Sequence, residues 1–225
     1  MKKEKISIIL PTYNEGKSIK ATISEIKSIL ADDNFQILVV DDSSTDNTEQ
    51  AAKESSAHVL VRKNKRGLAS AIMHGFQNSK TDLVFVLDAD GQHNPSPLPD
   101  MINALRSNSA DLVIGSRYLG KKTDMNFERK SISQIATFLS KPLAPKISDP
   151  LSGFFGVRLS KLSRNTNWHL IGYKLLLEIL SKNKTLRIKE YPFHFRARKS
   201  GASKISIFEV LRHLELLAFL YLEKL

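Results

Sequence analysis

The sequence LVFVLDADGQ, residues 83–92, joins five consecutive apolar residues to two aspartates that stand two positions apart. A short apolar run bounded by turn-forming residues predicts a strand buried on both faces. The carboxylates of Asp88 and Asp90 are therefore expected at the end of that strand, with the amide oxygen of Gln92 beside them. Such oxygen ligands suit Mg²⁺ or Mn²⁺, which commonly complete their coordination with substrate phosphates and water. Acidic residues at strand ends also form helix caps and turns, so this short pattern alone leaves both interpretations open.

Two earlier apolar runs end in polar residues in the same way. Residues 6–10 lead into PTYNE at 11–15, and residues 37–40 lead into DDSST at 41–45. The spacing of apolar residues predicts further strands at 58–61 and 111–115, and helices at 18–30, 45–53, 67–78 and 97–107. Alternating strands and helices indicate an α/β fold with a mostly parallel, doubly wound sheet and helices on both faces. Ligands bind beyond the carboxyl ends of such strands, so the three polar clusters predict one site.

Individual residues of these clusters have both a structural and a functional interpretation. Ser18 is expected to cap the first helix, and one of the polar residues at 43–46 to cap the second. Tyr13 beside Glu15 suits stacking on and hydrogen bonding to a nucleobase, although a simple turn explains both equally well. Asp42 suits a ribose hydroxyl or a base edge. His93, next to the acidic motif, is expected to support the site without binding the metal.

The second half of the sequence has a different character. A helix is predicted at 129–139, ending before Pro142 and Pro145, and an amphipathic helix at 205–225. Between them, residues 182–204 carry eight basic residues and one acidic residue, with three aromatic residues interspersed. Both helices are candidates for shallow insertion at a membrane interface, with core packing or a dimer contact as the alternative.

Composition limits the classes of protein that remain. The chain has 225 residues, 41% of them hydrophobic, and a formal net charge of +11, which favours anionic partners such as nucleic acid, phosphorylated ligands or acidic lipids. The absence of cysteine excludes disulfides and thiolate metal sites. No signal peptide is expected, and no apolar stretch approaches the roughly 20 residues that cross a bilayer. We therefore expect a cytoplasmic protein and, if it works on a membrane, one that acts peripherally from the cytoplasmic face.

Several ordered motifs give the sequence a specific resemblance. PTYNE at 11–15, VVDDSSTDNT at 39–48 and DADGQHNP at 88–95 follow one another as they do in family 2 glycosyltransferases. The later segments resemble the dolichol-phosphate (polyprenol-phosphate) mannose synthase branch of that family, and they are GLASA at 67–71, GSRY at 115–118, DPLSGF at 149–154, GYK at 172–174 and EYPF to RKSGASK at 190–204. The resemblance covers roughly residues 6 to 210, nearly the whole chain.

The resemblance implies a GT-A (Rossmann-like) fold in a single domain, 1–225, with a nucleotide-sugar and metal part at 6–120 and an acceptor part at 121–225. It implies that the nucleotide sugar is bound by Pro11, Tyr13, Glu15, Val40, Asp42, Asp88, Ala89, Asp90, Arg117, Arg198 and Lys204. It implies Mg²⁺ or Mn²⁺ held by Asp88, Asp90 and Gln92. The acceptor phosphate is expected at Arg117, Arg129 and Arg198, and the catalytic candidates are Asp90 and Arg117.

The implied reaction is inverting transfer of a hexose, with mannose from GDP-mannose favoured, onto a polyprenyl (dolichyl) phosphate. A UDP-sugar donor or a saccharide acceptor is the alternative within the same fold. A basic nucleic-acid-binding module is the alternative of another class, but three acidic strand ends in one cleft would repel nucleic-acid phosphates.

The sequence departs from the family in two places. Ser43 stands where the family often has glycine, and ordinary turn geometry is expected for it. The multispan membrane region of some members is absent from the sequence. Membrane attachment is therefore expected through surface helices on an anionic membrane, or through a small membrane-anchoring subunit.

Overall fold

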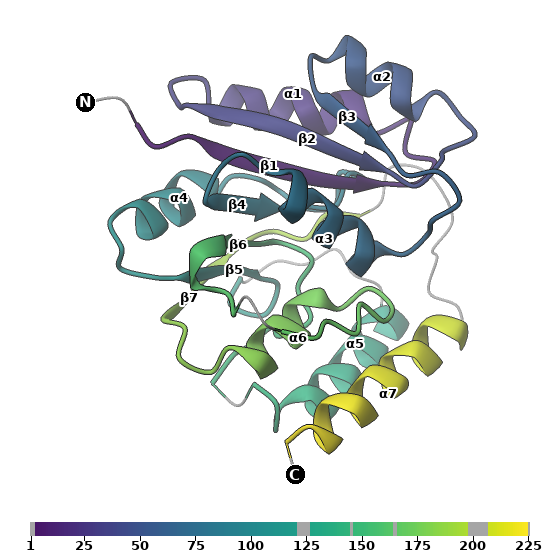
Figure 1. The fold of residues 1–225 in the computed structure, drawn as a ribbon, viewed down its shortest axis with the longest axis vertical. Coiled ribbons are helices and arrows are strands. Elements are labelled where there is room, and N and C mark those ends of the chain that lie inside the picture. The colour runs from purple at the N-terminus through teal and green to yellow at the C-terminus, as the bar shows by residue number, and fades with distance from the viewer. Residues whose placement is uncertain (1–2, 121–126, 145, 164–165, 198–206, 225) are drawn as a thin grey trace.

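A seven-stranded sheet forms the centre of the molecule in the computed structural model, which describes residues 3–120, 127–144, 146–163, 166–197 and 207–224. The strands are β1 (Ile6–Thr12), β2 (Phe35–Asp41), β3 (His58–Val61), β4 (Leu83–Val86), β5 (Leu112–Ser116), β6 (Phe155–Arg158) and β7 (Ile188–Pro192). The helices are α1 (Ile19–Ile29), α2 (Thr48–Glu54), α3 (Leu68–Asn78), α4 (Leu98–Arg106), α5 (Phe127–Ser140), α6 (Leu175–Lys182) and α7 (Ile207–Leu222), with a 3-10 turn at Leu159–Lys161. The strand order is β3-β2-β1-β4-β6-β5-β7 (Figure 1).

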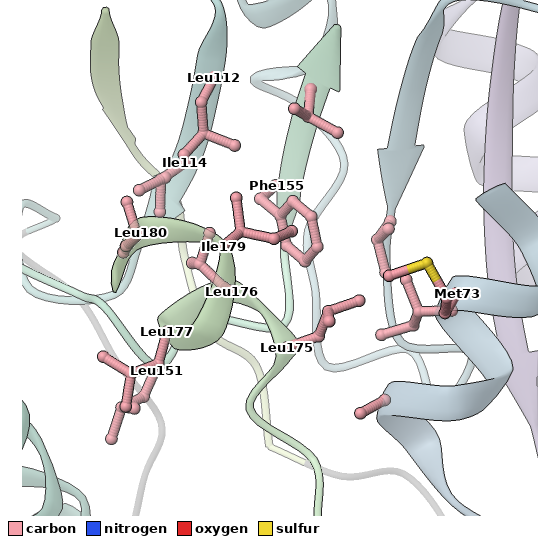
Figure 2. Close-up of a cluster of buried hydrophobic side chains, with 14 of the residues drawn as sticks. Met73, Leu112, Ile114, Leu151, Phe155, Leu175, Leu176, Leu177, Ile179 and Leu180 are labelled. Carbon is pink, nitrogen blue, oxygen red and sulfur yellow. The ribbon is translucent and has the colours of Figure 1, made fainter. Parts of the chain in front are cut away.

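Two hydrophobic clusters lie on the two faces of this sheet. Along β1, Ile8 and Leu10 belong to the cluster that contains residues of α1, α2 and α4, whereas Ile9 belongs to the cluster on the other face, with residues of α3, α6 and α7. Figure 2 shows part of this second cluster, in which side chains of α6 meet Phe155 of β6 and Met73 of α3. The predicted mostly parallel sheet with helices on both faces is therefore confirmed.

One strand of the sheet runs against the others. β6 is antiparallel to both β4 and β5 and lies between them, whereas β5 and β7 pair in parallel. The sequence predicted neither β6 nor β7, because β6 has only four residues, including Gly156, and β7 lies within the basic segment. A Cβ at Gly156 would lie 2.3 Å from the ring of Phe85, so glycine is required where β6 crosses this ring.

The starts of two helices differ from expectation. Ser18 occupies the N-cap position of α1, but its hydroxyl makes no cap bond and donates to the backbone carbonyl of Glu15 at 3.1 Å. α2 begins at Thr48, three residues later than predicted, because Asp46 accepts hydrogen bonds from the backbone N–H and the hydroxyl of Thr48. The polar residues after β2 are thus used to shape the loop.

α5 and α7 lie side by side at one end of the molecule (Figure 1). The Tyr221 hydroxyl donates to the carbonyl of Leu139 at 2.8 Å, and Lys224 donates to the carbonyl of Pro142 at 2.9 Å. Apolar side chains are exposed along this pair, and they are Ile135, Phe138, Leu139, Phe208, Leu211, Leu214, Phe219 and Leu222. Within the described ranges, neither these helices nor any other is long and apolar enough to span a membrane.

Candidate active site

A cleft of about 360 Å³ opens beyond the carboxyl ends of β1, β2 and β4. Its walls combine residues from all three polar clusters with residues from α3, from the loop before α6 and from α7. The lining residues are Pro11, Thr12, Tyr13, Glu15, Asp42, Arg66, Gly67, Leu68, Ala71, Asp88, Ala89, Asp90, Gln92, Tyr173 and Glu209. The parallel pairing of β1 with both β2 and β4 brings the clusters together, as their positions at strand ends predicted.

One end of the cleft presents an aromatic ring beside a guanidinium. The guanidinium carbon of Arg66 lies 4.3 Å from the ring centroid of Tyr13, a cation–π distance. The loop that carries Tyr13 is tied to α2, because the N–H of Glu15 donates to the Thr48 hydroxyl at 2.8 Å. A planar base can therefore stack on Tyr13 here, with Arg66 as a second planar partner.

Asp42 lies at the edge of this end and is already held by a buried arginine. Its Oδ1 accepts from Nε of Arg62 at 2.6 Å, and its Oδ2 accepts from Nη2 of Arg62 at 2.8 Å and from the N–H of Gly67 at 2.9 Å. Side chains of Asp42 and Arg62 are 8% and 4% exposed. A carboxylate offers about four lone-pair positions, so Asp42 keeps some capacity for a ribose hydroxyl or a base N–H.

The loop after Asp42 corrects the expectation of ordinary turn geometry at Ser43. Ser43 has φ 55°, in the left-handed region that glycine occupies without strain. Its hydroxyl donates to the carbonyl of Arg62 at 2.9 Å, which offsets part of the cost of this conformation. The loop therefore follows the path that a glycine would allow, although a serine occupies the position.

The acidic motif is supported by a buried histidine. The backbone N–H of Asp88 donates to Nδ1 of His93 at 3.0 Å, and Nε2 of the same ring lies 3.6 Å from Oδ2 of Asp88. His93 is enclosed by the rings of Phe154, Phe193 and Phe195. Burial lowers the pKa of His93 to about 4, so the ring is neutral near pH 7. His93 thus orients Asp88 from behind, in keeping with the expected supporting role.

The donor atoms of the motif fit a hard divalent cation. Gln92 donates through Nε2 to the carbonyl of Arg196 at 3.1 Å, which leaves its amide oxygen as the atom available to a ligand. A Cβ at Gly153 would lie 3.0 Å from Oδ2 of Asp88, so glycine keeps the space at this carboxylate open. In the part of the chain that the structure describes, no three His, Cys, Asp or Glu side chains cluster as a complete metal site. Two carboxylates and one amide oxygen would leave coordination positions to phosphate and water, as Mg²⁺ sites commonly do.

A cationic group lies beside the acidic motif. Arg117, which follows β5, donates through Nε and Nη2 to the fully buried Asp149 at 2.8 and 2.7 Å. Asp149 is held in turn by Glu190 of β7, which accepts its N–H at 3.2 Å. Lys174 donates to the carbonyl of Leu151 at 2.9 Å.

The two cations of this group are close enough to affect each other. Burial, followed by the nearby Arg117, lowers the pKa of Lys174 to about 7. The buried carboxylate of Asp149 interacts favourably with both cations.

The binding residues expected from the sequence fall into three groups according to where they lie in the structure. Pro11, Tyr13, Glu15, Asp42, Asp88, Ala89, Asp90 and Gln92 line the cleft. Val40 does not, because its side chain is fully buried in the core behind the loop, and Arg117 lies next to the cleft with its guanidinium on Asp149. Arg198 and Lys204 lie outside the described residues, as does the side chain of Arg129 in α5.

Other residues of the site carried no signal that assigned them a role. Arg62 and Arg66 precede the Gly67 motif in a basic loop that resembles any solvated surface, and Glu209 lies within an amphipathic helix. Tyr173, Lys174 and Asp149 belonged to recognised motifs without a stated role. Their positions in the cleft and beside it depend on contacts between segments far apart in the chain.

Comparisons with known proteins agree with this geometry. The model of the family described as Glycosyl transferase family 2 matches residues 7–200. The chain is 40% identical over 222 residues to a dolichol-phosphate mannosyltransferase of Pyrococcus furiosus, covering 93% of this chain and 62% of that protein. It is 34% identical over 218 residues to an undecaprenyl-phosphate mannosyltransferase of Micrococcus luteus, covering 90% of this chain and 88% of that protein.

A solved structure supports the fold. Glucosyl-3-phosphoglycerate synthase of Mycobacterium tuberculosis, crystallised with Mn²⁺, uridine diphosphate and glucosyl-3-phosphoglycerate, superposes with a TM-score of 0.69. The match covers 98% of this chain and 79% of that one at 22% identity. The expected GT-A fold is thereby confirmed.

Proposed function

This chain belongs to glycosyltransferase family 2, and from that premise we propose that it transfers mannose from GDP-mannose to a polyprenyl (dolichyl) phosphate. The chain spans about three fifths of the length of the Pyrococcus relative, so the activity of that whole protein comes to this one as a proposal. The observation that carries the proposal is that negatively and positively charged side chains lie close together at one cleft. Two aspartates at the end of β4 line it, and Arg117 and Lys174 lie close enough to Asp88 to interact with its charge.

The nucleotide half of the donor is proposed to occupy the end of the cleft that Tyr13 lines. Tyr13 offers a stacking surface, while Glu15 and Asp42 offer acceptors for base N–H groups or ribose hydroxyls. Asp88, Asp90 and Gln92 would hold Mg²⁺ or Mn²⁺, which when bound neutralises the diphosphate as it leaves. Ala89, buried between the two aspartates, lets the diphosphate approach the strand end closely.

The chemical step is a single in-line displacement. An oxygen of the acceptor phosphate forms a bond to the anomeric carbon, the bond from that carbon to the diphosphate breaks, and the configuration inverts. The acceptor monoester is already ionised near neutral pH, so no strong general base is needed. The protein instead has to hold two anions against each other, a task we assign to Arg117 on the acceptor side and, on the donor side, to the divalent cation that Asp90 would help to hold. Arg129, Arg198 and Lys204 are proposed as further phosphate contacts.

The acceptor lipid is proposed to reach the site along α5 and α7. Their exposed apolar side chains suit shallow insertion into a bilayer, and the net charge of +11 suits an anionic surface. This supports peripheral attachment at a cytoplasmic membrane face, where a small membrane-anchoring subunit could assist.

A donor screen tests the proposal. Purified protein, Mn²⁺, a short polyprenyl phosphate and a panel of GDP- and UDP-sugars should give a lipid-linked product from GDP-mannose. A product from UDP-glucose or UDP-N-acetylglucosamine alone would replace the donor assignment. No lipid-linked product from any donor would overturn the proposed function.

The metal assignment has its own test. Asp88→Ala should lower turnover by about 10³-fold, since it removes a ligand and a charge at the reacting centre. Asp100→Ala, on the exposed side of α4, is the matched control and should leave turnover unchanged. Near-normal turnover of Asp88→Ala with Mg²⁺ or Mn²⁺ present would contradict the assignment.

A further inference from the structure

One wall of the cleft has no role in the mechanism above. Glu209, in the first turn of α7, and Tyr173, just before α6, face the same space as Asp88 and Asp90. The two segments touch, because a Cβ at Gly172 would lie 3.5 Å from Cβ of Arg212. The carbonyl of Gly172 also accepts the N–H of Ala69 in α3, at 3.3 Å, which ties this wall to the floor of the cleft.

Glu209 and Tyr173 lie close to each other. Burial, and then the negative charge of Glu209, raise the pKa of Tyr173, and the same charge acts on Lys174. Tyr173 therefore keeps its hydroxyl proton near pH 7. One face of its ring is covered by Lys174, whose Nζ lies 4.1 Å from the ring centroid.

The carboxylate of Glu209 is available for a ligand. It is half-buried, and within the described ranges it forms no side-chain hydrogen bond and no ion pair within 4.0 Å. It does not join Asp88 and Asp90 in a three-carboxylate metal cluster among those residues. A carboxylate is an acceptor only, and a diphosphate would repel it, so its natural partners in this cleft are neutral hydroxyl groups.

The position of this wall indicates which hydroxyl groups these are. The base end of the cleft lies at Tyr13 and Arg66, and the diphosphate is proposed at the acidic motif. Glu209 lies with Tyr173 and Lys174, near the Arg117 group that is proposed to hold the acceptor phosphate. The transferred sugar has to lie between the two phosphates, and Glu209 lines the cleft together with the acidic motif and interacts with Lys174 of the Arg117 group.

We propose that Glu209, with Tyr173 beside it, forms the hexose subsite of the donor site, in which the carboxylate accepts hydrogen bonds from hydroxyls of the transferred sugar. This inference rests on the proposed function and adds the residues that recognise the sugar. A site built to bind a hydroxyl discriminates strongly against donors that lack it, because the buried acceptor is then left unpaired.

The test compares Glu209→Ala and Glu209→Gln with the wild type on the preferred donor and on its monodeoxy analogues. A hydrogen bond to a charged group contributes about 1.5–3 kcal/mol, so Glu209→Ala should lower kcat/KM for the preferred donor by about 10- to 150-fold. For the analogue that lacks the contacted hydroxyl, the same variant should differ from the wild type by no more than about twofold. Glu209→Gln, which keeps the shape of the side chain, should lie between the two.

Two controls keep the result interpretable. The Kd of the nucleoside diphosphate with Mn²⁺, measured by calorimetry, should stay within about twofold in both variants, since the sugar is absent from this ligand. Glu215→Gln makes the same charge change at an exposed position of α7 and should behave as the wild type.

Other outcomes would overturn the inference. An equal loss on every donor, or weaker binding of the nucleoside diphosphate, would assign Glu209 to the shape of the cleft and not to the sugar. Unchanged kcat/KM in Glu209→Ala would remove the contact altogether. If the wild type itself transfers no sugar from any donor, the proposed function fails and this inference fails with it. Transfer by the wild type with the same donor discrimination in Glu209→Ala defeats the inference alone.

Discussion

The loops after β1 and β2 differ from the α5–α7 pair in how their polar groups are paired and in how far their apolar side chains are buried. In the loops, carboxylates are paired within the protein: Asp41 accepts the Thr12 hydroxyl at 2.8 Å, and Asp42 holds Arg62. In the helix pair, large apolar side chains face outward, while the buried Thr137 Oγ1 and His213 Nδ1 have no partner among the described residues. The loops thus satisfy their carboxylates internally, whereas the helix pair leaves large apolar side chains exposed and two buried polar atoms without a partner among the described residues.

The largest effect is expected from breaking the preformed loops. Arg62→Met leaves Asp42 buried and unpaired, which should lower the free energy of unfolding by about 3–5 kcal/mol. Nucleoside diphosphate binding should weaken with it. Arg196→Met is the matched control: Arg196 makes a two-bond contact with Glu25, and both side chains are partly exposed, at 28% and 35%, so a loss of no more than about 1 kcal/mol is expected. Equal losses in urea titrations of the two variants would refute the distinction.

Of the two regions, the helix pair should contribute more to the loss of stability in acid, because it contains His213. Burial, followed by the charge of Lys174, lowers the pKa of His213 to about 4, from 6.5 for an accessible histidine. Below pH 6.5 the unfolded chain binds a proton that the folded chain refuses, so stability should fall between pH 6.5 and 4, by about 3 kcal/mol at most.

His213→Leu tests this assignment, since it removes the titrating group and the unpartnered nitrogen together. Its loss of stability on going from pH 7 to pH 4 should be smaller than that of the wild type, leaving the share that belongs to His93 and the carboxylates. Thermal unfolding across this pH range measures the difference. A variant with the full acid sensitivity of the wild type would assign that sensitivity elsewhere.

A smaller effect is expected from charging the exposed apolar face. Phe138→Glu with Leu211→Glu should weaken binding to vesicles with anionic lipids by about 2–3 kcal/mol, or roughly 30- to 150-fold, through lost apolar burial. Both side chains are more than half exposed, at 75% and 54%, so the free energy of unfolding should change by no more than about 0.5 kcal/mol. Flotation of the variant at the level of the wild type would show that the face has another partner.

The smallest effect is expected at Ser43. Ser43→Ala keeps the φ of 55° and loses the hydroxyl that donates to Arg62, so it should lose about 1 kcal/mol. Ser43→Gly also loses this bond but relieves the backbone strain, and its stability should lie closer to that of the wild type. Chemical denaturation of both variants gives the comparison, and a less stable glycine variant would show that the hydroxyl bond outweighs the strain.

The sequence predicted the central part of the fold because β1, β2 and β4 are apolar runs that end in polar residues. The cleft residues Tyr13, Asp42, Asp88 and Asp90 were predictable for the same reason, since the carboxyl ends of parallel strands meet at one edge of a sheet. Strand β6 was not predictable from the sequence, because four residues that include a glycine carry no periodic signal.

Other residues could not be predicted from the sequence because tertiary contacts bring them to the cleft. Arg62 and Glu209 look like ordinary surface charges, and only the packing of the 62–67 loop and of α7 against the cleft turns them inward. Val40 is the converse case: it belongs to a recognised motif, but its side chain packs in the core, and its contact with the nucleotide stays a prediction.

Strand β6 has a consequence for how the chain is made. Strands β1 to β4 are contiguous in the sequence and can pair with one another as they leave the ribosome. The outer edge of β4 and one edge of β5 must wait until residue 158 has been synthesised, because β6 is inserted between them, and the other edge of β5 waits for β7 at Ile188–Pro192. During that interval an apolar strand edge is exposed to other chains, which is a known route to aggregation. Expression should therefore depend on how fast translation passes from residue 86 to residue 158, and a fragment that stops between those residues should be insoluble.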